Sequence, residues 1–153
     1  MNAFYETYLG IIKITYDRKI KKIQLVDEIL EENLKSQMTD NVFLEIEQYL
    51  EGRRMQFTCF NHLEEIHEGF KKDVLDSLLK IPYGKTSTYK DIAKSIGRDK
   101  SYRAVGNALN SNPYPIIYPC HRVLGSDHKL KGFAYGLDTK KKLLDLENAK
   151  YRE

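Results

Sequence analysis

The sequence of 153 residues contains only two cysteines, Cys59 and Cys120, and has no apolar run that approaches the length of a membrane span. Its first ten residues, MNAFYETYLG, lack the cationic stretch and unbroken apolar segment of a secretory signal. We therefore expect a cytoplasmic protein without membrane contact, in which both cysteines are free thiols. With 41% apolar and 31% charged residues, the chain is typical of a soluble globular protein.

The charge balance permits a nucleic-acid partner without requiring one, because 25 basic residues face 22 acidic ones. The distribution is more informative, since positive charge gathers in the second half of the chain. This half is the predicted surface for an anionic ligand, although a solvated basic face without a partner is the alternative. The cations concerned are Lys94, Arg98, Lys100, Arg103, Lys129, Lys131 and Lys140 to Lys142.

The first part of the chain has the pattern of a small α/β lobe. Apolar and polar residues alternate over 4–17 and 20–26, which predicts half-buried strands that pair. Asp40 can cap a helix that extends to about Gly52, and the following MQFTCF segment (55–60) has the composition of another strand. The apolar period then changes, which places a domain boundary near residue 65.

Helical patterns dominate the second part, 66–153. Ile66, Phe70, Val74 and Leu78 predict an amphipathic helix that ends at IPYGK. Two short helices follow, the first capped by Thr88 and the second over 101–109, in a helix-turn-helix outline. Such pairs also occur as plain packing, so the outline leaves both interpretations open.

Cys120 and His121 are the candidate reactive pair. A thiol needs a base or a positive environment to form thiolate at neutral pH, and His121 is a candidate base. Neighbours in an extended chain point to opposite sides, so direct contact requires a local bend or a bridging water. Glu147 lies among leucines and needs a polar partner, which His121 could provide. The alternative is a structural cysteine beside an unrelated histidine.

Three segments resemble the signature blocks of the O6-alkylguanine-DNA alkyltransferases: IPYGKTSTYKDIAKSIG, YRAVGNALNSNPYPIIYPCHRVLGS and LKGFAYGLDTKKKLLDLE. The resemblance is nearly continuous from Ile81 to Glu147. The first part of the chain, with its strands, its helix and the segment YLEGRRMQF, is similar to the family only in outline. The implied fold is α+β, with a ribonuclease-H-like N-terminal domain (1–65) and a mostly helical C-terminal DNA-binding and alkyl-acceptor domain (66–153) that has a winged-helix-like helix-turn-helix.

The resemblance implies a role for each matching catalytic residue. Cys120 would be the alkyl acceptor, His121 its water-linked base, and Glu147 the group that holds the histidine. Asn112 would brace the active-site turn, and Tyr89 would contact a phosphate and help to protonate guanine. The implied reaction is a stoichiometric, irreversible transfer of an alkyl group, preferably methyl, from O6-alkylguanine or O4-alkylthymine after base flipping.

The resemblance also implies a DNA-binding face and a base pocket. Arg103 would fill the space of the extruded nucleotide, while the small residues of its helix allow a close approach. The implied DNA contacts are Arg103, Tyr89, Lys90, Arg98, Ser101, Ala104, Gly106 and Ser126. The implied alkylguanine pocket is formed by Cys120, Val123, Ala134 and Tyr135.

Some positions depart from the family pattern. Ala134 replaces a serine of some members, so only its backbone can donate to the guanine. Tyr135 replaces a frequent glycine and limits the room for large alkyl groups. His128 replaces a turn glycine, which predicts left-handed backbone there.

We expect no metal and no other cofactor, because Cys59, His62 and His67 offer three ligands at irregular spacing. The expected partner is double-stranded DNA containing O6-alkylguanine, bound by a monomer that could cluster on DNA. Three competing functions remain: a non-catalytic alkyltransferase-like binder, which would lack Cys120, a helix-turn-helix regulator, and a cysteine hydrolase.

Overall fold

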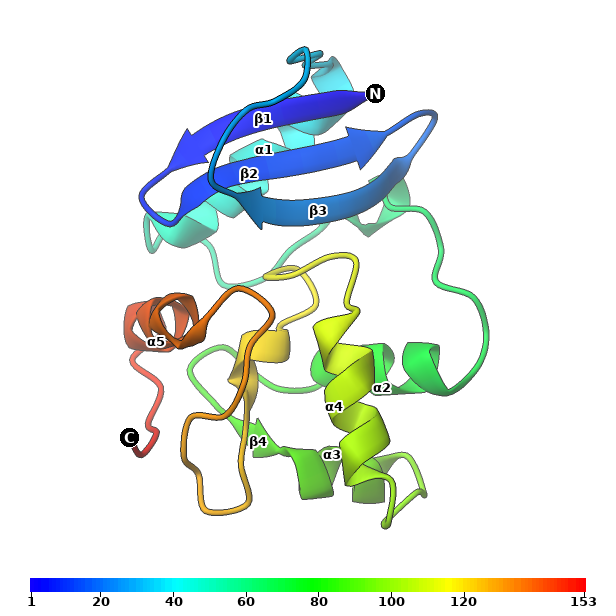
Figure 1. Cartoon of the computed structure of the whole chain (residues 1–153), viewed down its shortest axis with the longest axis vertical. Helices are drawn as coiled ribbons and strands as arrows, with labels where there is room; N and C mark the ends of the chain where they lie inside the picture. Colours follow the sequence, from blue (N-terminus) through cyan, green and yellow to red (C-terminus); the bar gives the residue numbers. More distant parts are fainter. The chain divides into compact units, whose positions relative to one another are not determined.

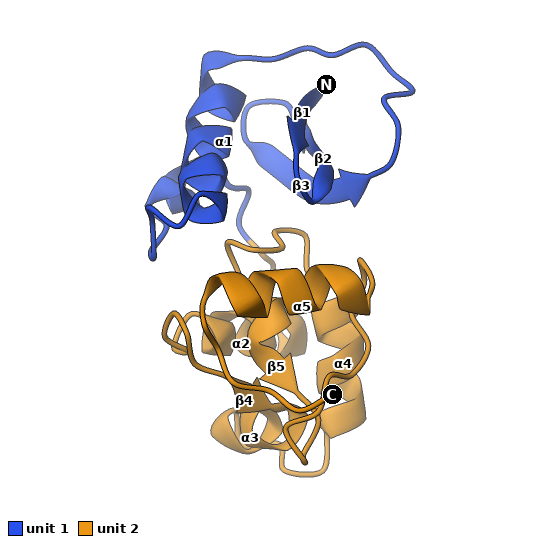
Figure 2. Cartoon of the chain, turned by 90° about the vertical axis from the view of Figure 1, so that its left-hand side faces the viewer, with its two compact units in different colours: residues 1–65 blue, residues 66–153 orange.

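The computed structural model describes residues 1–153 and has a mixed α/β fold. The chain divides into two compact units, residues 1–65 and residues 66–153 (Figure 2). None of the helices combines the length and hydrophobicity required to cross a membrane.

Unit 1 contains a three-stranded antiparallel sheet with strand order β1-β2-β3 (Figure 1). The strands are β1 (Asn2–Thr7), β2 (Gly10–Tyr16) and β3 (Ile20–Val26). The alternating segment 4–17 therefore forms a hairpin of two strands rather than one strand. Gly10, with φ of 125°, pairs with Thr7 at the turn, where a positive φ favours glycine.

One helix, α1 (Gln37–Leu50), lies across a face of this sheet (Figure 1). Its buried side includes Val42, Phe43 and Ile46, and the Phe43 ring stacks on Tyr5 of β1 with 4.2 Å between centroids. The predicted start of this helix at Asp40 is wrong. Ser36 is the N-cap: its hydroxyl accepts from the Thr39 amide, and the Thr39 hydroxyl accepts from the Ser36 amide.

The predicted strand at 55–60 is also wrong. The Glu45 carboxylate of α1 accepts hydrogen bonds from the amide and hydroxyl of Thr58, at 2.7 and 2.8 Å. These bonds hold the segment against the helix, and the chain continues into a 3-10 turn, η1 (Cys59–His62), that buries Cys59. The segment bonds to this helix and not to a strand of the sheet, so its strand-like composition does not decide its structure.

Unit 2 is mainly helical. Its elements are α2 (Phe70–Leu78), β4 (Ser87–Thr88), α3 (Tyr89–Ser95), α4 (Tyr102–Asn110), η2 (Cys120–Arg122), β5 (Val123–Leu124) and α5 (Leu137–Leu146). The first helix begins after Gly69, so the predicted first turn at Ile66 lies outside it, although Ile66 still packs on the core.

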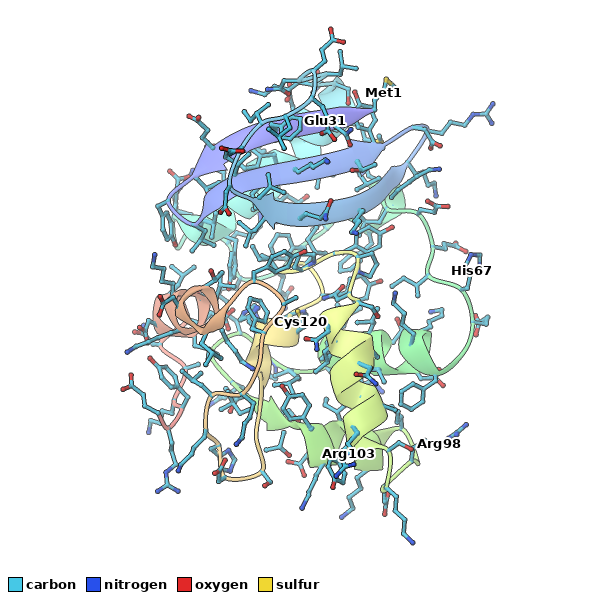
Figure 3. All side chains as sticks on the ribbon, in the orientation of Figure 1. Met1, Glu31, His67, Arg98, Arg103 and Cys120 are labelled. Atoms are coloured by element: carbon cyan, nitrogen blue, oxygen red, sulfur yellow. The ribbon has the colours of Figure 1, made fainter.

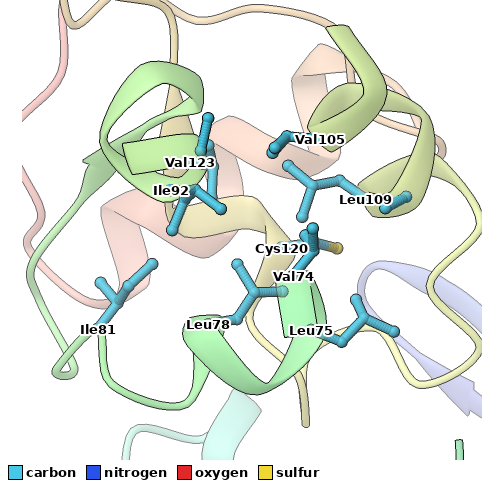
Figure 4. Close-up of a cluster of buried hydrophobic side chains, with 11 residues drawn as sticks. Val74, Leu75, Leu78, Ile81, Ile92, Val105, Leu109, Cys120 and Val123 are labelled. Atoms are coloured by element: carbon cyan, nitrogen blue, oxygen red, sulfur yellow. The ribbon is translucent and has the colours of Figure 1, made fainter. Parts of the chain in front are cut away.

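Helices α2, α3 and α4 pack together around the core of unit 2, and Cys120 is part of this core (Figure 4). The apolar side chains around it include Val74, Leu78, Ile92, Val105, Leu109 and Val123. A short parallel pairing of β4 with β5 joins Thr88 to Leu124. Thr88 also caps α3, as predicted, because its hydroxyl accepts from the Asp91 amide. Tyr89 is thereby fixed beside the segment that carries the cysteine.

Replacing Ser36 by alanine removes the acceptor for the Thr39 amide and should destabilise α1 by about 1 kcal/mol. Amide hydrogen exchange in the first turn of α1 should then accelerate about fivefold. Ser36→Asp keeps an acceptor oxygen and is the matched control, with exchange close to the unmodified protein. Equal exchange rates in the two variants would contradict the assignment of Ser36 as the cap.

Candidate functional site

Cys120 opens the 3-10 turn η2, so the chain bends at the Cys120–His121 pair instead of running extended. The Cys120 side chain is buried, with 6% of the residue exposed. The preceding loop contains Ile116 at φ of 75°, a conformation that a β-branched residue rarely adopts. Because strain of this kind costs roughly 1–3 kcal/mol, the buried packing of Ile116 and Ile117 must hold the loop in shape.

Asn112 holds both ends of that loop. Its side-chain amide donates to the Tyr118 carbonyl at 2.8 Å, and its carbonyl oxygen accepts from the Tyr114 amide at 2.9 Å. The Cys120 amide in turn donates to the Tyr118 carbonyl at 2.7 Å. Asn112 therefore links the loop directly to the backbone that presents the thiol.

His121 and Glu147 lie together, although 26 residues separate them in sequence. His121 Nε2 is 2.7 Å from Glu147 Oε2, and both side chains are fully buried. Glu147 is the residue that follows the last turn of α5. Its Oε1 accepts from the Gly84 amide at 3.0 Å. A side chain at Gly84 would meet the Glu147 backbone carbonyl at 3.1 Å, and the φ of 79° also favours glycine.

The buried carboxylate also pairs with Arg122, a residue to which the sequence analysis assigned no role. Arg122 Nε donates to Glu147 Oε1 at 2.9 Å and Nη2 to Oε2 at 3.1 Å, in a two-pronged pair. Its Nη1 donates to the Ile81 carbonyl at 2.8 Å. The sequence indicates this ion pair only through the position of Arg122, directly before the apolar residues Val123 and Leu124. An arginine in an apolar stretch is buried with it and then needs a carboxylate partner.

The electrostatic environment favours the neutral forms of the two candidate reactive groups. Burial lowers the pKa of His121 below its ordinary value, against the opposing effect of Glu147. Burial raises the pKa of the Cys120 thiol, while a hydrogen bond from Asn112 and the charge of Lys140 oppose the rise. A neutral imidazole beside a neutral thiol can accept its proton. Because Nε2 faces a carboxylate, we assign the imidazole proton to Nε2 and the acceptor lone pair to Nδ1.

Lys140 is not part of the exposed basic face to which the sequence analysis assigned it. It is 1% exposed, and its Nζ donates to the carbonyls of Val123, at 2.6 Å, and Lys131, at 3.2 Å. Burial lowers its pKa to about 8. Helical spacing could have revealed this, because Lys140 shares the inward face of α5 with Leu143 and Leu144, three and four residues later.

Tyr89, a predicted catalytic residue, and Tyr135, a predicted pocket residue, lie close enough to Cys120 to respond to its charge. Burial raises the pKa of Tyr89 and of Tyr135, and the Cys120 charge adds to both shifts. The Tyr89 hydroxyl donates to the Gly132 carbonyl at 3.4 Å. The amide of Val123 donates to the Cys120 carbonyl, so both polar backbone groups of Val123 already have internal partners.

The predicted DNA contacts lie mostly on the exposed surface of unit 2. Arg98 and Arg103 project near the connection between α3 and α4 (Figure 3). A cavity of about 400 Å³ next to α4 has Tyr89, Gly106 and Ser126 in its lining. Among the predicted DNA contacts, Ser101 and Gly106 are half-buried, and the exposed ones are Lys90, Arg98, Arg103, Ala104 and Ser126. Of the predicted pocket residues, Ala134 is exposed and Tyr135 is half-buried.

Two further sequence expectations concern His128 and a metal site. His128 has φ of 63°, so the left-handed backbone predicted there is confirmed. Within residues 1–153, no three histidine, cysteine, aspartate or glutamate side chains are arranged to hold a metal ion.

The site combines a buried thiol, a histidine–carboxylate–arginine cluster and the exposed Arg103 on α4, which is the arrangement of a protein that brings a reactive cysteine to a polyanion. Residues 69–149 match the family described as "6-O-methylguanine DNA methyltransferase, DNA binding domain". The chain belongs to this family.

Individual relatives extend the match to most of the chain. A methylated-DNA--protein-cysteine methyltransferase of Methanosarcina barkeri is 51% identical over 110 residues, covering 71% of this chain and 67% of the relative. A probable enzyme of the same name from Acanthamoeba polyphaga mimivirus is 39% identical over 142 residues, 93% of each chain. The crystal structure of Mycobacterium tuberculosis OGT in complex with DNA has a TM-score of 0.80 and 29% identity, covering 96% of this chain and 92% of that one.

Glu147→Gln should destabilise the protein by about 3 kcal/mol, because it leaves the buried Arg122 cation without its counter-ion. Urea denaturation followed by circular dichroism measures the loss. Glu153→Gln is the matched control: Glu153 pairs with Lys141 on the surface, and breaking that pair should change stability little. Equal stability of the two variants would show that the Glu147 pair does not stabilise the fold.

Lys140→Met should raise the pKa of Cys120 further, because the Lys140 ammonium favours the thiolate. The pH at which iodoacetamide alkylates Cys120 at half its maximal rate should therefore move upward. Cys59 contributes little background, since burial raises its pKa to about 12. Lys141→Met, which removes a neighbouring exposed cation, should leave the midpoint in place, and a midpoint that falls in Lys140→Met would contradict the coupling.

Proposed function

We propose that this protein repairs alkylated DNA by transferring the alkyl group of O6-alkylguanine to the sulfur of Cys120. The observation that carries the proposal is the placement of Cys120 next to the buried His121–Glu147–Arg122 cluster, in a chain of the 6-O-methylguanine DNA methyltransferase family. A helix-turn-helix regulator needs no such cluster.

The transfer forms one bond and breaks another. The thiol proton passes to His121 through a water molecule, and the thiolate attacks the alkyl carbon in line with the guanine oxygen. A carbon–sulfur bond forms as the carbon–O6 bond breaks, and guanine leaves with a proton that Tyr89 helps to supply. The thioether product offers no carbonyl for water to attack, so one molecule repairs one lesion.

His121 suits the role of base because it is neutral and held by Glu147. The carboxylate fixes the ring through Nε2 and stabilises the imidazolium that forms when Nδ1 takes the proton. Arg122 holds the same carboxylate in place and supplies its counter-charge. Asn112 contributes the shape of the loop and a hydrogen bond to the sulfur.

DNA binding is assigned to unit 2, with α3 and α4 as a winged-helix-like helix-turn-helix, and unit 1 is assigned as a ribonuclease-H-like domain. The exposed Arg103 and Ala104 on α4 support this assignment, because a long cation next to small residues can approach the DNA closely. Base flipping is required, since the O6 substituent lies within the stacked duplex. Arg103 would occupy the space that the nucleotide leaves.

Methyl is the proposed preferred substrate, with O4-alkylthymine as a second one. Tyr135 lies near Cys120 and packs edge-on against Phe133, with 5.9 Å between ring centroids. This packing limits the movement of the Tyr135 ring and therefore the room for larger alkyl groups. The protein would act as a cytoplasmic monomer that can cluster on DNA.

Mixing the protein with a duplex that contains O6-methylguanine tests the proposal directly. Intact mass spectrometry should show one added methyl group that maps to Cys120 and saturates at one equivalent. Cys120→Ser should gain no mass while it still binds the duplex. DNA binding with no mass gain in the unmodified protein would leave a regulator as the better assignment, and repeated turnover of an ester would indicate a hydrolase.

A further inference from the structure

The 400 Å³ cavity beside Tyr89 contains Lys131, which has no role in the proposed alkyl transfer, next to Lys90, one of the implied DNA contacts. Lys90 of α3 and Lys131, in the segment after β5, both contribute to its lining, together with the hydroxyl-bearing Ser126. None of its lining residues is an aspartate or a glutamate. The cavity lining therefore presents cations and hydrogen-bond donors, and no carboxylate, to whatever enters the cavity.

Both lysines are held at the cavity wall by neighbouring groups. The Lys90 ammonium lies 5.7 Å from the centre of the Tyr102 ring, within range of a cation–π contact. The stem of Lys131 lies against Gly125: a Cβ atom at Gly125 would come within 2.9 Å of Lys131 Cγ and 2.8 Å of its Cε. Only glycine at position 125 leaves room for the Lys131 stem in this place.

Lys131 is also connected to the reactive segment through its backbone. The Lys140 ammonium donates to the carbonyls of Lys131 and of Val123, and Val123 lies three residues after Cys120. This single buried cation therefore ties the backbone at Lys131 to the segment that carries the thiol.

One carboxylate on the same turn interacts with Lys131 without lining the cavity. Asp127 accepts a hydrogen bond from the Lys129 amide at 3.1 Å, which lowers its pKa, and the charges of Lys131 and Lys129 lower it further. The carboxylate thus bonds to the backbone of its own turn.

We infer that Lys131, together with Lys90 and Ser126, binds a phosphate oxygen of the lesion-containing DNA strand and so fixes that strand relative to Cys120. Ammonium and hydroxyl groups only donate when they meet an anionic oxygen, and phosphate supplies such oxygens along the whole duplex. The inference rests on the proposed DNA-repair function and adds Lys131 as a positioning residue.

The test measures how duplex binding by Lys131→Gln depends on salt. Each lost phosphate contact should reduce the slope of log affinity against log salt concentration by about 0.9. Raising NaCl from about 50 to about 200 mM lowers the affinity of both proteins. The factor of this loss should be about three to four times smaller for the variant than for the unmodified protein. Anisotropy with undamaged and O6-methylguanine duplexes should give the same change in slope, because a phosphate contact does not depend on the base.

The controls separate a specific contact from a general loss of charge. Lys129→Gln removes the same charge from the same turn but outside the cavity lining, and should keep the slope of the unmodified protein. Lys131→Arg should restore the slope. An unchanged slope in Lys131→Gln, an equal change in Lys129→Gln, or an effect confined to the damaged duplex would each overturn the inference. Methyl transfer, followed by mass in the same samples, reports the proposed function separately.

Discussion

The Glu147 carboxylate is the group on which the site depends. It is fully buried and accepts from the Gly84 amide, the Arg122 guanidinium and the His121 ring. A single buried carboxylate without partners would be too costly to maintain, and so would the buried arginine. The cluster therefore joins the end of α5 to the turn η2 and to the loop before β4 in one arrangement.

That cluster explains how a cysteine in an apolar core can be reactive. Burial disfavours the Cys120 thiolate, so the thiol stays neutral until a base removes its proton. The same burial keeps His121 neutral and able to accept it. In the proposed mechanism, the alkyl acceptor and its base therefore lie in a buried environment, where Lys140 adds a positive charge near the sulfur.

The backbone around the site is also held in an unusual conformation. Ile116 adopts a left-handed conformation within a loop whose ends are tied by Asn112, and this shape sets the direction of the Cys120 backbone. The pairing of β4 with β5 brings Tyr89 to the same place from another part of the chain. Two short segments, each too short to be stable alone, are held together by the core of unit 2.

The sequence by itself determined what is local or carried by a motif. The Thr88 cap and the amphipathic helix ending at Leu78 follow from short-range spacing, and the family follows from the residues around Cys120. Tertiary structure decided the rest. Residues 55–60 have the composition of a strand but are held against α1 by hydrogen bonds to Glu45. Lys140 points inward because two carbonyls from other segments accept hydrogen bonds from its ammonium. Arg122 joined Glu147 across 25 residues. Such pairings depend on which groups the fold buries together, and no short window of sequence contains that information.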